Sequence, residues 1–457
     1  MKKVLVPIYD GSISKALVDS GALQVLVQAG YAVVLTVEER KVDYYRERFG
    51  GKGYTVLPRP VVPRSAWLVR LYNIGVGAIP TRMMFLRHLR RMMERKKYVL
   101  GFLRLGVWCL GLWRPTRWVL QHLVLLHPIP KSVRDLVDQE QPEMIFCPTL
   151  LSLEELDLLR YAKRRGIPVV GMVKTWDNVT TKLNMPIAPD HLIVHTGRVR
   201  EEAVRYLHYP AADISVVGLP QFDRYSDPAL QETREAFFQR MGLDLNKPLL
   251  LFCAAGLWMS PDEVDLLVRL NADIERGVFG PLQVLVRMHP KYDCGADHLK
   301  DQQHLKLDRP GTYVTKDLTT WEYEDSDLRH LISSLRFADV SSNTASTMSV
   351  EAAYFDRPVI CIGFDPKPTS WIMSNARYFE REYYLPIVQS GGVRLVSSYE
   401  QYVQAVKDYL ADPRLDHAGR EQIVREQCIS REPIAAEALG RVLLGFLRRE
   451  RPLFTRV

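Results

Sequence analysis

Cysteine is scarce in this chain of 457 residues. Its six cysteines lie far apart and form neither a C-x-x-C pair nor a cluster with histidine. This spacing excludes the usual zinc-binding patterns and gives no sign of a disulfide framework, so we expect reduced thiols in a cytoplasmic protein. Low-complexity tracts and internal repeats are also missing, and the length suits two or three globular domains.

Long apolar runs are missing as well. A membrane-spanning helix needs about 20 nearly uncharged residues. Arg104 interrupts the most apolar stretch, residues 99–113, and Arg114 and Arg117 follow it. The N-terminal sequence MKKVLVPIYDG has too short an apolar run for a signal peptide and predicts a strand instead.

Acidic residues are nearly absent between residues 59 and 134. This segment contains twelve arginines and three lysines against a single acid, Glu94, and it holds four of the eight tryptophans. Basic residues mixed with Trp, Leu and Phe are typical of a helix lying in the plane of an anionic membrane surface. We therefore predict a basic amphipathic insert at about 64–130 that contacts such a membrane. The alternative is a helical insert with a solvated basic side. Nucleic acid is not an expected partner, because no nucleic-acid-binding motif accompanies these residues.

Apolar strands alternate with helices along the chain, which predicts an α/β protein. The valine-rich strand before Gly218-Leu-Pro-Gln-Phe-Asp223 resembles the crossover between the two domains of many GT-B enzymes, which implies domains at about 1–220 and 221–430. A C-terminal helix within 431–457 is expected to cross back onto the first domain. In the first domain we predict strands at 3–8, 31–37, 144–148, 167–173, 191–195 and 214–217, and helices at 14–30, 153–165 and 198–207. In the second we predict strands at 249–255, 283–289, 338–340 and 358–363, and a helix at 347–355.

Three predicted strand ends in the second domain carry polar or flexible residues. One strand precedes Gly256, one ends at His289-Pro290, and one runs into the hydroxyl-rich loop Ser341-Ser-Asn-Thr344. Open α/β sheets bind ligands outside the carboxyl ends of their strands. Ser, Thr and Asn cap helix starts, and a helix start suits a phosphate. Glu351, one turn further along, is placed to bind ribose hydroxyls. The alternative is an ordinary well-capped helix.

This order of a His-Pro pair, a Ser-Ser loop and a helical Glu resembles the donor-binding half of GT-B glycosyltransferases. It looks most like the group that includes bacterial capsule sialyl- and Kdo-transferases and CDP-glycerol glycerophosphotransferases. The resemblance covers about 249–387 and is weaker in the first half. It implies two Rossmann-like domains facing a cleft, with the acceptor in the first and a nucleotide donor in the second. Carried onto this chain, it implies a catalytic phosphate contact by His289, phosphate binding by Ser341, Ser342 and Thr344, and ribose binding by Glu351. Gly256 and Asn343 at the same strand ends, and the charges of Arg287 and Lys291, complete the predicted donor site.

Two carboxylates at strand ends of the first domain are candidates for the catalytic base, which must reach an acceptor hydroxyl. Asp10 follows the first strand, and the sialyltransferase-like group is similar in having an acid before Gly, although that group tends to have a pair. Asp177 lies in Trp-Asp-Asn-Val-Thr-Thr-Lys, a stretch similar to one in the glycerophosphotransferase-like group. The resemblance implies acceptor or phosphate contacts by Trp176, Asn178 and Lys182. An Asx-type turn is the structural alternative.

We therefore expect a glycosyltransferase that moves a sugar from a nucleotide-sugar to a hydroxyl of a surface-glycan or lipid-linked acceptor. Capsule or cell-envelope polysaccharide synthesis at the cytoplasmic face of the membrane is the expected setting, with peripheral membrane association. Neither a metal nor a cofactor is expected besides the nucleotide-sugar substrate, since no Asp-x-Asp pair lies at a strand end. The alternatives are a CDP-glycerol-type polyol-phosphate transferase, a non-catalytic membrane-associated scaffold and a nucleotide-sugar 2-epimerase, because fold alone does not determine function.

Overall fold

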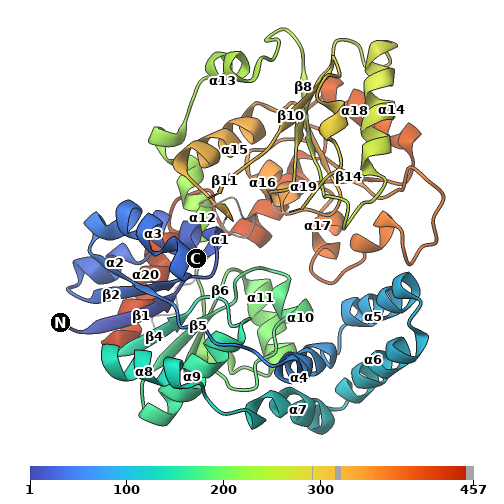
Figure 1. The fold of residues 1–457 in the computed structure, drawn as a ribbon. Helices are drawn as coiled ribbons and strands as arrows, with labels where there is room; N and C mark the ends of the chain where they lie inside the picture. Colours follow the sequence, from blue (N-terminus) through green and yellow to red (C-terminus); the bar gives the residue numbers. More distant parts are fainter. Residues whose placement is uncertain (291, 314–320, 449–457) are drawn as a thin grey trace. The chain divides into compact units, whose positions relative to one another are not determined.

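The computed structural model describes residues 1–290, 292–313 and 321–448, and the chain divides into two units (Figure 1). The first unit contains Met1–Asp223 together with the C-terminal residues from Pro433 onward. The second unit contains Arg224–Glu432. Each unit has its own parallel sheet and its own apolar core.

The sheet of the first unit has seven parallel strands in the order β3-β2-β1-β4-β5-β6-β7. Its central strands are apolar and almost fully buried, as expected for a parallel sheet covered on both faces. The strand order reverses between β1 and β4. The strands are β1 (Lys3–Pro7), β2 (Ala32–Val37), β3 (Tyr54–Pro58), β4 (Met144–Cys147), β5 (Val169–Met172), β6 (His191–Val194) and β7 (Ile214–Val216).

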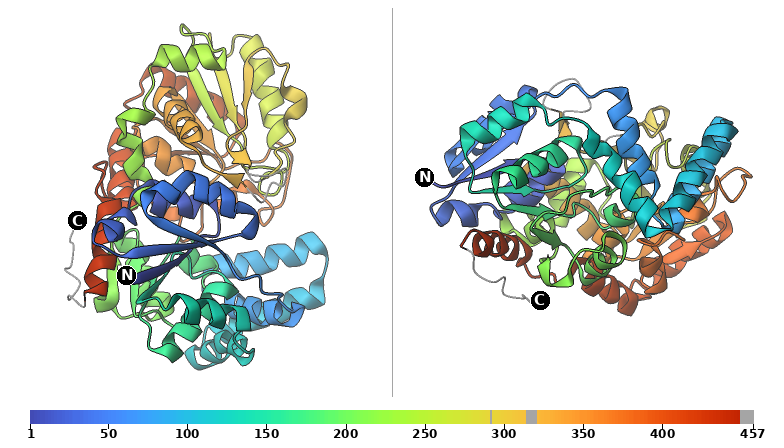
Figure 2. Two further views of the ribbon diagram at one scale, coloured as in Figure 1. Left: turned by 60° about the vertical axis from the view of Figure 1, so that its left-hand side comes forward. Right: turned by 90° about the horizontal axis from the view of Figure 1, so that it is seen from below.

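Two separate apolar clusters cover the two faces of this sheet. One contains residues of α3 (Val42–Phe49) and of the C-terminal helix α20 (Ala435–Leu447), which runs beside α2 (Gln24–Gln28) (Figure 2). The other contains residues of α8 (Lys131–Glu140) and α9 (Leu153–Arg165). The shorter helices are α1 (Gly11–Ser14), α10 (Asn178–Thr181), α11 (Gly197–Glu202) and α12 (Pro220–Asp223).

The continuous helix predicted at 14–30 is interrupted. A π-helical turn at Lys15–Asp19 follows α1, and the chain leaves the helix before α2 begins. Gly21 adopts a left-handed φ of +83°, which a helix interior does not contain, and the Ser20 hydroxyl bonds back to the Ala16 carbonyl oxygen. Both features break the helical hydrogen-bond ladder.

Four of the helices between β3 and β4 lie within the segment 64–130. α5 and α6 pack side by side, and the Trp108 indole donates to the Thr81 carbonyl oxygen at 3.0 Å. No helix among the described residues is long and apolar enough to cross a membrane. The four helices are α4 (Ala66–Gly77), α5 (Arg82–Arg95), α6 (Tyr98–Gly111) and α7 (Arg114–His122).

The second unit has six parallel strands in the order β10-β9-β8-β13-β14-β15, beside a short antiparallel pair of β11 (Thr312–Tyr313) and β12 (Trp321–Glu322). The predicted α/β fold with two Rossmann-like sheets is thus confirmed. The strands of the larger sheet are β8 (Leu249–Cys253), β9 (Gln283–Arg287), β10 (Leu305–Asp308), β13 (Val340–Asn343), β14 (Val359–Ile362) and β15 (Arg394–Val396). The helices are α13 (Arg234–Met241), α14 (Glu263–Glu275), α15 (Asp325–Phe337), α16 (Met348–Tyr354), α17 (Leu385–Gln389), α18 (Tyr399–Ala411) and α19 (His417–Ile423).

Candidate functional site

The second sheet reverses its strand order between β8 and β13. In open α/β sheets, ligands bind outside the carboxyl ends of the strands at such a reversal. Three of the predicted segments meet at this edge, because β9, β8 and β13 are adjacent and parallel. His289 follows β9, Gly256 follows β8, and the loop from Ser341 to Thr344 begins within β13. The three strands end at the same height in the sheet, because Asn343 of β13 pairs with Cys253 of β8, and Cys253 pairs with Arg287 of β9.

Two polar groups at the end of β13 are buried and have no hydrogen-bond partner within the described part of the chain. The first is the hydroxyl of Thr344, whose residue is only 1% exposed. The second is Nδ2 of Asn343, whose Oδ1 accepts from the Ser346 N–H and the Ser349 hydroxyl, each at 3.0 Å. A buried polar group without a partner costs about 1–3 kcal/mol. Such groups in a native fold therefore call for a ligand or another explanation.

Of the two serines of the motif, Ser342 has a hydrogen-bond partner inside the unit, whereas the buried hydroxyl of Ser341 has none among the described residues. Ser342 Oγ lies 3.1 Å from the Tyr402 hydroxyl on α18. Ser341 faces the thiol of Cys253, and burial, the largest effect, raises the pKa of that thiol to about 12 although Arg287 and the Ser341 hydroxyl lower it. Both serines are fully buried, so direct donor contact by their side chains stays a prediction.

Glu351 lies in the first turn of α16, and a tyrosine fixes its carboxylate. The Tyr225 hydroxyl donates to Glu351 Oε2 at 2.7 Å. Burial, with a smaller contribution from Glu351, raises the pKa of the Tyr225 phenol well above its usual range, so the phenol keeps the proton that it donates. The ring of Tyr225 is itself held against Tyr354 and Phe355. The predicted ribose contact of Glu351 would therefore use a carboxylate of fixed orientation.

His289 belongs to a row of three aromatic rings at the same strand ends. Its Nδ1 accepts the Tyr292 backbone N–H at 3.2 Å, which places the proton of the neutral ring on Nε2. The rings of His289 and Tyr292 are 4.4 Å apart, and Tyr292 stacks on Trp258 at 5.9 Å. Trp258 is 65% exposed. Our sequence reasoning missed Trp258 and Tyr292, although Trp258 follows the predicted site residue Gly256 by two positions and Tyr292 follows His289 by three. Lys291 lies outside the described residues.

The loop after β8 depends on a glycine and on a buried carboxyl group. Gly256 has a φ of +84°, and a Cβ there would lie 2.9 Å from Tyr292 Cβ. Oε2 of Glu263 accepts the backbone N–H groups of Ala255 at 2.8 Å and Gly256 at 3.4 Å. Burial raises the pKa of Glu263 to about 8. The loop that presents Trp258 is thus held by a carboxyl group whose ionisation the fold opposes.

Arg287 is buried and pairs with Asp308 at 2.6 Å. Asp308 also lies 2.9 Å from Nε2 of His330. Burial alone would raise the pKa of Asp308, but His330 and Arg287 together lower it. The Arg287 charge is therefore balanced within the unit, and its predicted contact with a donor stays a prediction.

In the first unit, Asp10 lies beside the corresponding reversal, after β1. Its Oδ1 caps α1 by accepting the N–H groups of Ser12 at 3.1 Å and Ile13 at 3.3 Å. Its Oδ2 accepts a hydrogen bond from the ammonium group of Lys174 at 2.6 Å, and Lys174 follows β5. Lys174 is held in turn by His195, whose Nε2 is 2.8 Å from the Lys174 carbonyl oxygen. The structure thus joins the ends of β1, β5 and β6 through Asp10.

Asp177 is also held by several hydrogen bonds and by one lysine. It accepts hydrogen bonds from Thr175, Asn178, Thr181 and Lys182, the last at 2.8 Å. Burial alone would raise the pKa of Asp177, but Lys182 and the neighbouring hydroxyls outweigh it, and the pKa is lowered. Asn178 is buried and forms the turn bonds that the structural alternative describes. Trp176 packs against the core of the first unit, and contact of Trp176, Asn178 or Lys182 with an acceptor stays a prediction.

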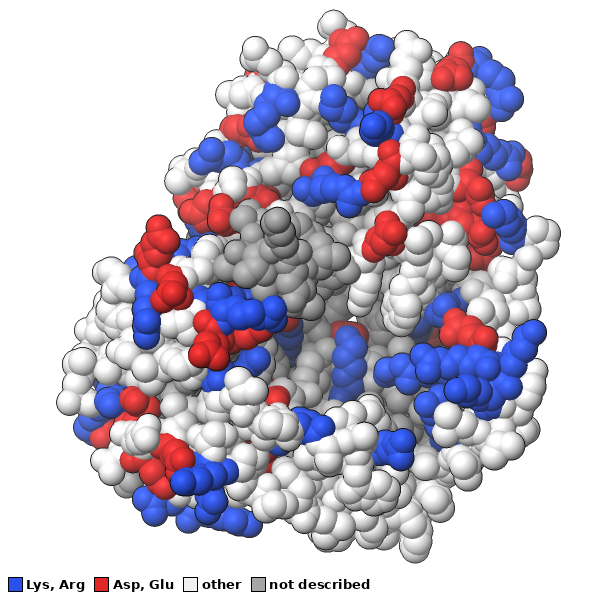
Figure 3. Space-filling model, viewed as in Figure 1, with Lys and Arg blue, Asp and Glu red and all other residues white. Residues whose placement is uncertain are grey.

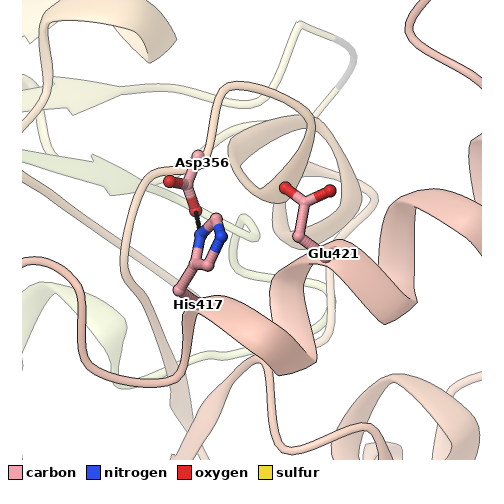
Figure 4. A group of neighbouring side chains, drawn as sticks. All are labelled: Asp356, His417 and Glu421. Carbon is pink, nitrogen blue, oxygen red and sulfur yellow. Dashed lines mark hydrogen bonds and ion pairs between the residues drawn. The ribbon is translucent and has the colours of Figure 1, made fainter.

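One group of possible metal ligands occurs among the described residues. It is formed by a residue that follows α16 and by two residues of α19. Ligand atoms of Asp356, His417 and Glu421 all lie within 4.8 Å of one another (Figure 4). However, Asp356 also binds Arg420 at 2.8 Å, and two nitrogens of Arg431 bind Glu421. These arginines already neutralise both carboxylates, so the group is best explained as an ion-pair network that joins α19 to the end of α16.

Comparison with known proteins identifies the fold. No family model matches the chain, and no curated protein matches it. Among solved structures, S. aureus MnaA with UDP has a TM-score of 0.58 at 12% identity, covering 98% of this chain and 97% of its own. A putative UDP-N-acetylglucosamine 2-epimerase from Listeria monocytogenes has a TM-score of 0.58 at 11% identity, with coverages of 100% and 99%. A glycosyltransferase from Rickettsia africae ESF-5 has a TM-score of 0.53 at 10% identity, with coverages of 98% for both chains.

At these identities the likeness concerns the fold alone. It extends over nearly the whole of both chains, so it includes both sheets. The narrower resemblance to the capsule-transferase and CDP-glycerol group stays a prediction. This chain therefore has a GT-B-like α/β fold, with parallel Rossmann-like sheets of seven and six strands.

Proposed function

We propose that this protein is a glycosyltransferase that uses a nucleotide-sugar donor, related in mechanism to the capsule sialyl- and Kdo-transferase group. The proposed acceptor is a hydroxyl of a surface glycan or a lipid-linked glycan at the cytoplasmic face of a membrane. The single observation that carries the proposal is the pair of buried polar groups of Asn343 and Thr344, which lack partners among the described residues at the β8–β13 reversal. Other features of each unit support it.

The edge of the second sheet offers suitable groups for each part of a nucleotide. The Thr344 hydroxyl and the Asn343 amide are donors for phosphate oxygens, and Nε2 of His289 is a third. The fixed carboxylate of Glu351 is an acceptor for ribose hydroxyls. The exposed ring of Trp258, backed by Tyr292, offers a face on which a base can stack. Similar solved structures carry UDP or UDP-GlcNAc, which is consistent with this class of donor.

The first unit supplies the candidate base. In the proposed reaction the acceptor oxygen forms a bond to the anomeric carbon, the bond from that carbon to the donor phosphate breaks, and its electron pair leaves with the nucleotide. The hydroxyl proton passes to Asp10. We favour Asp10 over Asp177 because Asp10 follows β1, at the strand-order reversal of the first sheet, where open α/β sheets bind ligands. Donors fixed near the departing phosphate stabilise its charge without reorganising.

A lipid-linked acceptor is supported by contacts between the insert and the loop that contains Asp177. The Thr81 hydroxyl at the start of α5 donates to the Thr180 carbonyl oxygen at 2.8 Å. Arg87 on α5 donates to the Thr181 carbonyl oxygen at 3.2 Å. An acceptor anchored in a membrane beneath the insert would thus be presented from the side of the first unit that carries this loop.

The test is transfer of radiolabelled sugar from candidate nucleotide-sugars to membrane extracts. The wild-type protein should label a glycan or glycolipid with one donor. Asp10→Asn should lose at least about a hundredfold in rate while binding the nucleotide as tightly as the wild type, because a general base contributes 10²–10⁴-fold. Full activity of Asp10→Asn would exclude Asp10, and Asp177→Asn would then be the next variant. Phosphate retained in the product would favour the CDP-glycerol-type alternative.

Nucleotide-sugar 2-epimerisation is a second candidate. It is favoured by the likeness to structures described as UDP-N-acetylglucosamine 2-epimerases, two of which have TM-scores of 0.58 and 0.53. An epimerase needs no acceptor, whereas a transferase does. Conversion of a nucleotide-sugar in the absence of any acceptor, followed by NMR of the sugar ring, would favour the epimerase. A protein that binds no nucleotide and converts none would be the non-catalytic scaffold.

A further inference from the structure

The outward face of α6 is apolar along its whole length. Residues at helical spacing on this face are exposed, and none of them is charged or strongly polar. Val99 is 78% exposed and Phe102 65%. This is the reverse of an ordinary surface helix, whose outer face is polar. The face consists of Val99, Phe102, Leu103, Gly106, Cys109 and Leu110, and Trp113 extends it beyond the helix end.

The opposite face of α6 is already used for packing within the insert. The Trp108 ring lies 5.1 Å from Phe85 of α5. Gly101 and Gly111 are buried because Met92 of α5 and the backbone of Ala78 approach them too closely for a side chain. These contacts fix the rotation of α6 about its axis. The helix therefore cannot turn its apolar face inward.

Positive charge surrounds this apolar face. Figure 3 shows Lys and Arg side chains gathered over α5 and the α5–α6 turn, beside uncharged surface. Residues 82–117 contain ten Arg or Lys residues and a single acid, Glu94. Burial lowers the pKa of Arg91, and the nearby charges of Arg104 and Arg95 lower it further. These three arginines therefore lie close to one another. A shallow cavity of about 490 Å³ at the start of α6 is lined by Lys96, Lys97, Tyr98, Val99, Leu100 and Leu103.

We propose that the α5–α6 pair docks on an anionic lipid bilayer, with α6 lying in the plane of the surface and its Val99–Phe102–Leu103–Leu110 face inserted among the acyl chains. The lysines at the start of α6 then lie at headgroup level. α7 extends the contact through Trp118, which is exposed as Trp113 is. Tryptophan favours the boundary between headgroups and acyl chains. This inference names the partner of the insert and deepens the membrane location given under the proposed function.

Charge decides between a bilayer and a second copy of the chain. Two copies joined through α6 would bring two strongly basic rims together, and like charges across an interface oppose association. An anionic membrane instead complements the rim, and each basic residue near the surface strengthens binding by roughly fivefold. The 14-residue length of α6 suits an in-plane helix and is too short to span a bilayer.

The test measures cosedimentation of the full chain with vesicles of phosphatidylcholine and with vesicles containing about 30% phosphatidylglycerol. The wild type should bind the anionic vesicles, and its affinity should fall as salt is raised. The variant Phe102→Ser/Leu103→Ser should bind at least about tenfold more weakly, because two inserted apolar side chains are lost. Lys96→Gln/Lys97→Gln should also lose roughly tenfold or more, and only on anionic vesicles.

The matched control is Leu245→Ser/Val268→Ser, which removes two exposed apolar side chains from the second unit and should bind vesicles as the wild type does. Equal binding by the wild type and the Phe102→Ser/Leu103→Ser variant would overturn the proposal. The proposal would also be overturned if the wild type bound no vesicles and instead formed dimers that the Phe102→Ser/Leu103→Ser variant does not form. Nucleotide binding is measured on the same samples, so failure of the donor site is distinguished from failure of the docking surface.

Discussion

Thr344→Val is expected to stabilise the protein and to weaken nucleotide binding at once. The Thr344 hydroxyl is buried and has no partner among the described residues, so the folded protein without ligand carries an uncompensated desolvation cost. Valine has nearly the same shape and removes the hydroxyl. If the hydroxyl exists to bind a donor phosphate, its removal helps the empty fold and harms the complex, which is the usual relation between stability and binding sites.

The magnitudes follow from the two environments of the hydroxyl. An unpaired buried polar group costs about 1–3 kcal/mol, so we expect a gain of about 1 kcal/mol in the free energy of unfolding. For a unit of this size that gain corresponds to a melting temperature about 2–4 °C higher. A hydrogen bond to a charged group contributes about 1.5–3 kcal/mol, which predicts a roughly 10- to 150-fold loss in nucleotide affinity.

The assay combines thermal unfolding with calorimetric titration of the nucleotide. Thr36→Val is the matched control, because Thr36 is also fully buried with no hydrogen-bond partner among the described residues for its hydroxyl, but it lies in β2 of the first unit. It should gain stability and keep the wild-type affinity. Unchanged affinity in Thr344→Val would remove this hydroxyl from the site, and a lower melting temperature would refute the argument about its burial.

The remaining predictions concern the aromatic row and the loop after β8. Trp258→Ala should weaken nucleotide binding by about 5- to 150-fold, since a stacked base contributes about 1–3 kcal/mol. Trp371→Ala, in a loop of the same unit, is the control and should leave nucleotide binding unchanged. Equal titration curves for the two variants would contradict the stacking role of Trp258. The pKa of Glu263 is about 8 in the fold and near 4.5 in the unfolded chain, so its stabilising contribution is complete below pH 4.5 and is lost as the pH rises through 8, by up to about 5 kcal/mol. Melting temperatures across that range should therefore fall less for Glu263→Gln than for the wild type, and parallel curves would show that Glu263 does not titrate this way.

The sequence predicts the sheets well because buried parallel strands have a recognisable residue pattern. Buried strands are continuous apolar runs, and their ends are marked by residues that cannot continue them, such as Pro290 after His289. Three such ends in the second unit were predicted to meet, and the adjacent order of β9, β8 and β13 brings them to one edge. The break in the helix at 14–30 was not predicted, although Ser20-Gly21 is a dipeptide that marks turns, because an isolated glycine is also tolerated within a helical pattern.

Contacts between distant segments were beyond the reach of sequence patterns. Asp10 and Lys174 are 164 residues apart and belong to different strand ends, so no local motif relates them. Trp258 and Tyr292 stack only because the loops after β8 and β9 lie side by side. The apolar outer face of α6 is readable as a periodicity, but only packing shows which face turns outward. Composition predicts a basic, apolar segment, and the structure shows which residues of α6 are exposed.

The most direct test of the central claim is nucleotide binding to the purified full chain. Melting temperatures would be measured with CMP, CDP, UDP and GDP and with their sugar conjugates, for the wild type and for His289→Ala. A ligand that binds only the folded state raises the melting temperature by mass action. We expect one nucleotide series to raise the melting temperature, and we expect His289→Ala, folded as the wild type, to lose the increase. A well-folded wild type that responds to no nucleotide would exclude the proposed donor site.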